Sequence, residues 1–303
     1  MASYYHQHTI VYLDGNFVPV SGATTDLYSQ SLHYGYAVFE GIRSYRTVSG
    51  ETRIFKADAH FNRLAASAKA LNMPYPWEKQ ALIDATYRLL AQNNLQDAYI
   101  RPLVFAPANM SFQLNTESHI VIQVWQMAPF LGEKMLRVTT SPYQRPNPAA
   151  FPIEAKASGL YVNSILASQE AKARGYDEAL LHDMQGYVAE APGANLFFEK
   201  GGTLFTPATG NILPGITRAT VLELCDELHI PVEEGSYHTK DIYGADAAFF
   251  CGTAAEIIGM ASLDDHAFSL PWEQSQSRLL QQAYTALVKE NHLNLANEIA
   301  GIE

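Results

Sequence analysis

Lys156 is the first residue of this chain whose type and setting could carry chemistry. It lies in the run Ala-Lys-Ala-Ser-Gly at residues 155–159, where small side chains would let a flat ring approach the backbone. A lysine in an apolar setting loses its proton readily, and its neutral amine forms an imine with an aldehyde. Most lysines are solvated surface charges, however, and the spacing of Lys156 alone favours that ordinary interpretation.

Glu190 is the second such residue. It lies between the strand-like segment Tyr187–Ala189 and a Pro-Gly turn at residues 192–193. There it could be an ordinary turn carboxylate. If its side chain points inward, it needs a cationic partner, because an unpaired buried charge is costly. A protonated pyridine nitrogen would be such a partner, and the pairing would make the ring an electron sink.

Two turns have the size and composition of anion sites. Leu-Pro-Gly-Ile-Thr-Arg at 213–218 opens a predicted helix, and Gly-Thr-Ala-Ala at 252–255 follows a predicted strand. Proline and threonine also begin ordinary helices. The free N–H groups at a helix start nevertheless suit a phosphate, with the Thr217 hydroxyl as a further donor. Arg63, on the predicted helix 60–71, is either a surface arginine or another phosphate contact.

Together these features suit one kind of ligand, an aldehyde cofactor with a phosphate tail, which is pyridoxal 5′-phosphate. The patterns of other chemistries do not occur: the chain has no phosphate loop with Gly-Lys-Ser/Thr, no Gly-x-Gly-x-x-Gly after a strand and no His-Glu-x-x-His. Cys225 and Cys251 have no metal spacing and make no disulfide framework. We therefore expect no metal site.

The composition argues against nucleic-acid and membrane partners. The formal net charge is −11, whereas nucleic-acid surfaces gather Lys and Arg. No apolar run approaches the length of a membrane span. The first residues, Met-Ala-Ser-Tyr-Tyr-His, lack the apolar core of an export signal. We expect a cytoplasmic protein that acts on small molecules.

The hydrophobic pattern predicts an α+β protein of two domains, the natural expectation for 303 residues. The predicted N-terminal domain is 1–128, the linker 129–135 and the C-terminal domain 136–303. Predicted helices are 60–71, 81–91, 163–174, 216–228 and 272–289. Predicted strands are 10–13, 17–20, 36–45, 53–55, 99–105, 120–125, 136–140, 179–182, 187–189, 196–198, 247–251 and 257–260, and the proline-rich stretch 142–152 is predicted to be irregular.

In their order along the chain, these segments resemble those of the fold type IV pyridoxal-phosphate enzymes, and most closely the branched-chain amino acid aminotransferases. The resemblance covers nearly the whole chain, and the ordered set is specific although each segment alone is weak. It implies a smaller N-terminal and a larger C-terminal α/β domain with the cofactor between them. The matching segments are Tyr12–Gly15, Leu32–Gly35, Val38–Arg43, His60–Leu64, Tyr99–Pro102 and those around Lys156, Glu190, Pro214–Thr217 and Gly252–Glu256.

The resemblance implies roles toward the cofactor. Lys156 would hold the cofactor covalently and, once released by the substrate, would carry the proton between the substrate α-carbon and the cofactor. Glu190 would pair with the pyridine nitrogen, and Tyr161 would hydrogen-bond the ring oxygen. The residues implied to bind the phosphate are Arg63, Ile216, Thr217 and Thr253.

The resemblance also implies a site that accepts both apolar side chains and glutamate. Its implied residues are Tyr34, Phe39, Arg43, Tyr99, Arg101, Phe130, Thr253, Ala254 and Ala255. The last three and Tyr99 would bind the α-carboxylate, and the two arginines would lie where glutamate's second carboxylate fits. The implied reaction is amino transfer between leucine, isoleucine or valine and 2-oxoglutarate in a ping-pong cycle. The implied assembly is a homodimer in which Tyr34 reaches the second subunit's site, with larger assemblies left open.

Three departures from the family pattern lie near the implied substrate site or among the residues that support it. Ala189 stands where Ser or Thr usually precedes the glutamate, and Ala106–Phe112 replaces a Gly-rich stretch. Pro129-Phe130 occupies a place where an aromatic residue with a hydroxyl is common. These departures leave the implied cofactor contacts intact and put the side-chain preference in question.

Other activities on the same fold remain alternatives. They are D-amino acid and (R)-amine transaminases, an aminodeoxychorismate lyase, and a binding protein without catalysis. Phe-Glu-Gly-Ile-Arg at 39–43 favours the branched-chain group, and the retained Lys156 and Glu190 argue against a binding protein. The sequence leaves open the exact amino-acid preference and whether the cellular role is synthesis or degradation.

Overall fold

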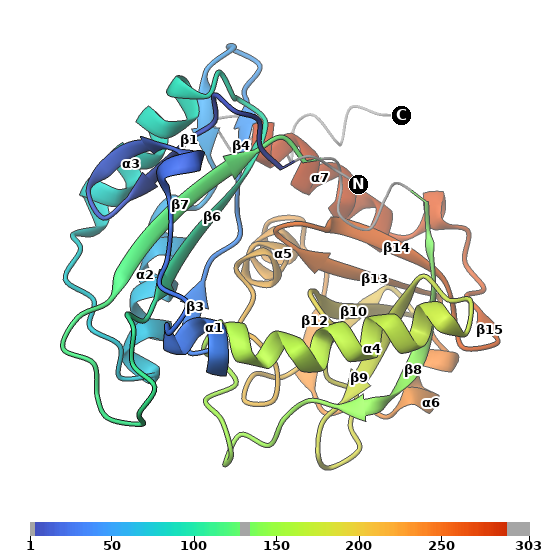
Figure 1. Cartoon of the computed structure of the whole chain (residues 1–303). Coiled ribbons are helices and arrows are strands. Elements are labelled where there is room, and N and C mark those ends of the chain that lie inside the picture. The colour runs from blue at the N-terminus through green and yellow to red at the C-terminus, as the bar shows by residue number, and fades with distance from the viewer. Residues whose placement is uncertain (1–3, 128–133, 290–303) are drawn as a thin grey trace. The chain divides into compact units, whose positions relative to one another are not determined.

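The structure is a computed structural model that describes residues 4–127 and 134–289 (Figure 1). Backbone contacts divide the chain into two compact units. Residues 1–128 with 155–160 form the first unit, and residues 129–154 with 161–303 form the second. Each unit combines one sheet with helices, so the predicted α+β class is confirmed (Figure 1). The predicted linker at 129–135 lies largely outside the described residues.

The sheet of the first unit is antiparallel, in the order β2-β1-β7-β6-β4-β5, and β3 pairs with β6 (Figure 1). Asp14 and Gly15 adopt positive φ angles of 45° and 90°, which form the tight turn between the first two strands. Alternate residues of β7 are buried, as expected where one face of a strand covers a core. The strands are β1 Ile10–Leu13, β2 Asn16–Pro19, β3 Ala37–Phe39, β4 Ile42–Arg46, β5 Thr52–Ile54, β6 Ala98–Phe105 and β7 His119–Trp125.

Two long helices cover this sheet. α2 places Phe61, Leu64 and Ala68 on its buried face, which is the spacing of an amphipathic helix. It contacts α3 and β3, and α3 contacts β1 and β7. The helices predicted at 60–71 and 81–91 are therefore confirmed. The helical elements of the unit are α1 Gln30–Tyr34, α2 Ala57–Ala70, α3 Lys79–Gln92 and the short 3₁₀ turns η1 Val20–Gly22 and η2 Ser158–Leu160.

The single strand predicted at 36–45 is divided into β3 and β4, although both pair with β6 in one continuous register. Glu40 donates its N–H to the Pro102 carbonyl at 2.8 Å, and its side chain is fully buried. A Cβ atom on Gly41 would lie 2.0 Å from the Tyr99 hydroxyl oxygen, so this position requires glycine. Pro102, opposite Glu40, has no N–H to return the bond, so the ladder of hydrogen bonds is interrupted between β3 and β4.

The sheet of the second unit has the order β12-β11-β10-β13-β14-β8-β9, and β15 pairs with β14 (Figure 1). β8 pairs in parallel with β9 and β14, β11 pairs in parallel with β12, and the other pairs are antiparallel. The strands are β8 Leu136–Gln144, β9 Glu178–His182, β10 Asn195–Lys200, β11 Thr203–Pro207, β12 Val232–Gly235, β13 Ala247–Gly252, β14 Glu256–Leu263 and β15 His266–Ala267.

Helices pack against several of these strands. α4 contacts β8 and β9, whereas α5 and α7 contact β13 and each other. The helical elements are α4 Tyr161–Ala173, α5 Ile216–Glu227, α6 Thr239–Tyr243, α7 Gln276–Lys289 and the 3₁₀ turn η3 Trp272–Gln274. The helix predicted at 272–289 is thus a 3₁₀ turn followed by α7. Over residues 4–127 and 134–289, no helix is long and apolar enough to cross a membrane.

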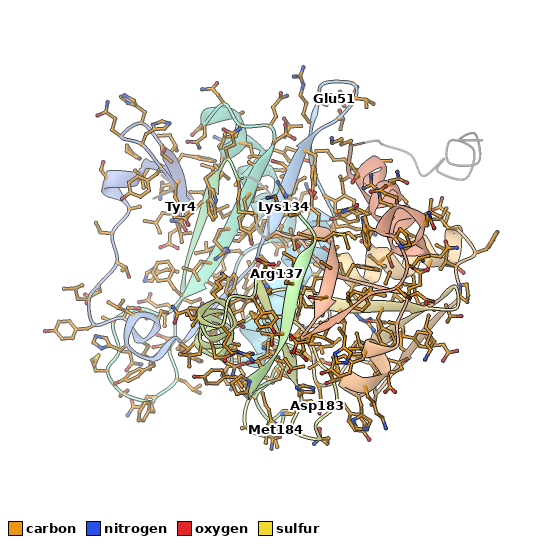
Figure 2. All side chains as sticks on the ribbon, turned by 90° about the vertical axis from the view of Figure 1, so that its right-hand side faces the viewer. Tyr4, Glu51, Lys134, Arg137, Asp183 and Met184 are labelled. Atoms are coloured by element: carbon orange, nitrogen blue, oxygen red, sulfur yellow. The ribbon has the colours of Figure 1, made fainter. Side chains whose placement is uncertain are left out.

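Two further segments of this unit differ from the prediction. β8 runs to Gln144, inside the stretch predicted to be irregular, because Gln144 pairs with His182 after a shift of register. The segment 187–189 is not a strand, because the chain folds back on β9 and only Val188 bridges to His182. Figure 2 labels Asp183 and Met184 on the turn where this reversal begins.

Residues 155–160 were predicted in the second domain but pack with the first unit. Phe39 donates its N–H to the Lys156 carbonyl at 3.0 Å, and Lys156 donates its N–H to Ser67 Oγ at 3.0 Å. Gly35 and Gly159 approach so closely that a Cβ atom on Gly35 would lie 2.8 Å from the Gly159 Cα. The small residues around Lys156 therefore allow two backbone segments to pack together, and this segment carries Lys156 into the first unit.

Candidate active site

Lys156 is half-buried on the edge of β3 rather than a solvated surface charge. Its neighbour Ala157 is fully buried and bridges to Val38. The Lys156 ammonium nitrogen lies 5.0 Å from the centroid of the Phe39 ring. The Lys156 side chain is therefore directed along an aromatic ring of the first unit.

A cluster of three charged or titratable side chains lies beside it, and we call Glu40, His60 and Arg63 the Glu40 cluster. Arg63 donates from Nε to Glu40 Oε1 at 2.7 Å and from Nη2 to Oε2 at 2.9 Å. Oε2 also lies 2.7 Å from His60 Nδ1 and accepts from the Gly41 N–H at 3.2 Å. The Glu40 side chain is 0% exposed and that of Arg63 is 13% exposed. Arg63 is therefore held by two charge-assisted bonds in the fork geometry of a guanidinium.

The pKa values in this cluster show which groups are charged. Burial alone would raise the pKa of Glu40, but the charges and hydrogen bonds of Arg63 and His60 lower it to about 2. Burial lowers the pKa of His60, with Arg63 and Lys156 acting in the same direction and Glu40 against it. His60 is thus neutral near pH 7, and its Nδ1 carries the hydrogen that is donated to Glu40.

Phe39, Tyr99 and Arg101 lie together on one face of the same sheet. The Arg101 guanidinium lies 4.5 Å from the centroid of the Phe39 ring, and its Nη2 donates to the Tyr99 hydroxyl at 3.2 Å. Arg43 pairs across the sheet with Tyr99 and donates from Nη2 to the Met127 carbonyl at 3.1 Å. These cations on aromatic rings form a surface that suits an anionic group beside an apolar one.

Tyr34 lies on α1, where 47% of it is exposed and its ring lies 5.6 Å from that of Phe112. Phe130, with Pro129, lies outside the described residues. The departure at 106–112 ends in Phe112, which is 91% exposed.

In the second unit Glu190 is buried and held at both oxygens. Oε1 accepts from the Leu213 N–H at 3.1 Å and lies 3.0 Å from Arg145 Nε. Arg145 Nε makes no hydrogen bond, so its contact with Glu190 is an ion pair whose N–H is not aligned with the oxygen. Oε2 accepts from the Asn195 amide at 3.0 Å. The backbone of Glu190 bridges to that of Asn195 and bonds to β9 through Leu181, which fixes the direction of the carboxylate.

Asn195 links Glu190 to the start of α5. Its amide also donates to the Leu213 carbonyl at 3.0 Å. A Cβ atom on Gly215 would lie 2.0 Å from Asn195 Oδ1, so the residue that precedes α5 must be glycine. α5 then begins at Ile216, with Thr217 buried in its first turn. The segment that leads into α5 is therefore anchored to the Glu190 carboxylate both through Asn195 and directly through the Leu213 N–H.

The second predicted anion turn joins β13 to β14. Gly252 pairs with Glu256 across it, and Thr253 and Ala254 between them are half-buried. A Cβ atom on Gly252 would lie 3.1 Å from the Gly193 carbonyl oxygen, so this turn packs against the Pro-Gly turn after Glu190. Three sequence-predicted segments of the second unit, 190–193, 213–217 and 252–255, thus lie together. Tyr161 is the first residue of α4 and is half-buried.

Sequence reasoning missed four residues of these arrangements: Glu40, His60, Arg145 and Asn195. Glu40 and His60 lie within the matched segments, and a glutamate inside an apolar run was a usable signal for a buried, partnered carboxylate. Arg145 lies in the proline-rich stretch, where nothing in the sequence distinguishes it. In residues 4–127 and 134–289, no group of three or more His, Cys, Asp or Glu side chains could hold a metal ion.

Comparisons with known proteins place these observations in context. The family described as "Amino-transferase class IV" matches residues 37–263. A branched-chain-amino-acid aminotransferase of Pseudomonas aeruginosa is 38% identical over 92% of each chain. The structure of the Escherichia coli branched-chain amino acid aminotransferase has a TM-score of 0.90 and 33% identity, over 95% of this chain and 98% of that one. The branched-chain amino acid aminotransferase of Thermobaculum terrenum, in its PLP-bound holo form, has a TM-score of 0.87 and 33% identity, over 96% of this chain and 97% of that one.

Proposed function

Because this chain belongs to the class IV aminotransferase family, we propose that it transfers amino groups between branched-chain L-amino acids and 2-oxoglutarate with pyridoxal 5′-phosphate as cofactor. The amino acids are leucine, isoleucine and valine. The observation that supports this most is the pair of Lys156 and Glu190, the first half-buried against Phe39 and the second buried and held at both oxygens. They occur in a chain that matches named branched-chain aminotransferases over most of its length.

The residues of the chain fit this cofactor. An anion suits the start of α5, where Ile216 and Thr217 follow a glycine whose Cβ atom would clash. Arg63 offers a guanidinium and Thr253 a hydroxyl for the same phosphate. Tyr161 is proposed to bind the ring oxygen. Glu190 offers a buried carboxylate to a cationic ring nitrogen.

The chemistry divides between the cofactor and the protein. When bound, pyridoxal phosphate supplies an aldehyde carbon for the amino group and a ring that accepts electrons. Once released by the substrate, Lys156 Nζ removes the proton from the substrate α-carbon and delivers it to the cofactor. Glu190 stabilises positive charge at the ring nitrogen. The Glu190 carboxylate is already in position when the charge of the ring changes during the reaction, so no reorganisation is needed.

The proposed substrate site combines an apolar wall with cations. Phe39 supplies the ring that a branched side chain would contact, and Arg101 on that ring suits the second carboxylate of glutamate. Arg43 is proposed to support the same carboxylate. The α-carboxylate is proposed to bind Tyr99 and the backbone of Thr253, Ala254 and Ala255. Tyr34 and Phe130 are proposed to complete the apolar wall.

We also propose that the chain forms a homodimer. An exposed apolar surface on α1 and the 106–115 segment supports this: Phe112 is 91% exposed and Leu114 is 76% exposed. Tyr34 packs against Phe112 within this surface. Contiguous apolar surfaces of this kind usually mark an interface. Light scattering of the full chain should give twice the chain mass, and Phe112→Ser should lower the measured mass.

The two buried cysteines are free thiols, which supports the proposed cytoplasmic location.

A substrate panel tests the proposed reaction. Glutamate should form from 2-oxoglutarate with leucine, isoleucine or valine as amino donor, and the purified protein should absorb visible light. Lys156→Ala should remove both the visible absorption and the activity, because no other amine can replace its covalent contact. Turnover of D-alanine or (R)-1-phenylethylamine with none of leucine would instead assign the chain to another activity of this fold.

A further inference from the structure

The Glu40 cluster contains two side chains that none of the roles above uses. Glu40 is fully buried, and its carboxylate accepts four hydrogen bonds, two of them from Arg63 and one each from His60 and the Gly41 N–H. A buried carboxylate requires such partners for its own stability. Arg63 does not have the same need, because its side chain is partly exposed at 13% and could meet water. The bonds between the two side chains therefore do more to order Arg63 than to satisfy its charge.

The geometry fixes the plane of the Arg63 guanidinium. Both bonds come from one edge, Nε to Oε1 at 2.7 Å and Nη2 to Oε2 at 2.9 Å. A long arginine side chain otherwise samples many rotamers, and ordering them costs free energy on binding. With this edge directed at Glu40, the Nε hydrogen and one Nη2 hydrogen are not available to a phosphate. Glu40 in turn is held by His60 on α2 and by the N–H of its neighbour Gly41.

We propose that Glu40 is a positioning residue, which sets the orientation of Arg63 and thereby the preference of this site for a phosphorylated over an unphosphorylated pyridoxal. This inference rests on the proposed function, which gives Arg63 its phosphate. Glu40 does not touch the cofactor in this account. It acts through Arg63, and His60 acts through Glu40.

The net charge of the Glu40 cluster, considered alone, predicts that loss of the Glu40 carboxylate strengthens phosphate binding. With Glu40 ionised, Arg63 cationic and His60 neutral, the cluster has no net charge. Removing the charge of Glu40 would make it cationic and should strengthen the binding of a phosphate dianion if charge were decisive. If orientation is decisive, the same change weakens that binding, because Arg63 loses its fixed plane. The sign of one measurement therefore separates the two accounts.

The experiment compares two ligands on the full chain freed of cofactor. Wild type and Glu40→Gln are titrated with pyridoxal 5′-phosphate and with pyridoxal, and visible absorption gives both dissociation constants. We expect the ratio of the constant for pyridoxal to that for pyridoxal phosphate to fall roughly tenfold, the size of effect seen when a residue that orients a metal ligand is lost. A general loss of structure would weaken both ligands alike and leave the ratio unchanged.

Two further variants make the test specific. Glu40→Asp keeps the charge but shortens the side chain, so it should also lower the ratio, and it serves if Glu40→Gln does not fold. Glu199→Gln is the matched control, because Glu199 is also a buried carboxylate and accepts from Ser277 and Gln276 in the second unit. It should keep the wild-type ratio whatever its effect on stability.

The outcomes distinguish this inference from the proposed function. If the wild type shows no visible absorption with either ligand, the cofactor itself is wrong. If the wild type prefers the phosphorylated ligand and Glu40→Gln or Glu40→Asp has an equal or larger ratio, Glu40 does not position Arg63. A lowered ratio in both Glu40 variants, with the Glu199→Gln ratio unchanged, supports the role of Glu40.

Discussion

Glu40 in the first unit and Glu190 in the second are both buried glutamates paired with an arginine, but their partners differ. Glu40 receives two aligned bonds from the Arg63 guanidinium and a third from His60. Glu190 lies beside Arg145 without an aligned N–H and accepts from two neutral donors, the Asn195 amide and the Leu213 backbone. In the first arrangement the carboxylate of Glu40 fixes the direction of the Arg63 guanidinium. In the second, the neighbouring donors and Arg145 fix the direction of the Glu190 carboxylate. A buried glutamate beside an arginine can therefore either orient the cation or be oriented itself.

Arg145→Met should have the largest effect and test the pairing in the second unit. It would leave the buried carboxylate of Glu190 without its cation, so the free energy of unfolding should fall by about 3–5 kcal/mol. Urea unfolding measures this change. The double variant Arg145→Met with Glu190→Gln should recover part of the loss, since the neutral amide needs no cation. An equal loss in the single and double variants would show that Arg145 stabilises the unit by packing alone.

Glu190→Gln should have the next largest effect, on catalysis. At saturating cofactor, kcat for leucine and 2-oxoglutarate should fall about 10²–10³-fold, the typical cost of losing one preorganised electrostatic partner. Glu40→Gln measured in the same way should lower kcat much less, because its role is proposed to lie in binding the phosphate. Similar losses of kcat in the two variants would show that the two glutamates do not have the separate roles proposed for them.

Acid should weaken the first unit through Glu40. Its pKa is about 2 in the folded protein and 4.5 as the ordinary value, so the unfolded chain binds the proton more readily. The stabilisation by the charged form is full above pH 4.5 and is lost as the pH falls from 4.5 through about 2. The difference in urea stability between wild type and Glu40→Gln should therefore shrink over this range. A difference that stays constant with pH would mean that Glu40 is not ionised in the folded state.

Thiol labelling should give the smallest effect and report the second unit alone, because both cysteines lie there. Burial raises the pKa of Cys225 to about 12 and also raises that of Cys251. At about pH 8, where an exposed cysteine is partly ionised, the native protein should not react with a thiol reagent. Arg145→Met should speed labelling, whereas Glu40→Gln should not. Faster labelling in Glu40→Gln would show that the two units do not open independently.

Local patterns predicted much of the fold, because they depend on short-range periodicity. α2 and α3 were predicted from apolar residues at helical spacing, and β1 and β2 were predicted as separate strands at 10–13 and 17–20. The interruption at Glu40-Gly41 was missed, since it depends on Pro102 of β6, which local sequence does not place opposite Glu40. The end of β8 was missed for a related reason: pairing with β9 keeps Gln144 extended despite nearby prolines.

By itself the sequence determined which chemistry the chain is suited to, because the order of Lys156, Glu190, the two anion turns and the other matching segments along the chain is specific to one family. Only the tertiary structure decided which partner each buried charge has. A buried carboxylate must find a donor or a cation, but many residues along the chain could serve. Glu40 meets Arg63, 23 residues away, because β3 and α2 pack together, and Arg145 meets Glu190 because β8 pairs with β9. These contacts depend on folding that local sequence does not encode.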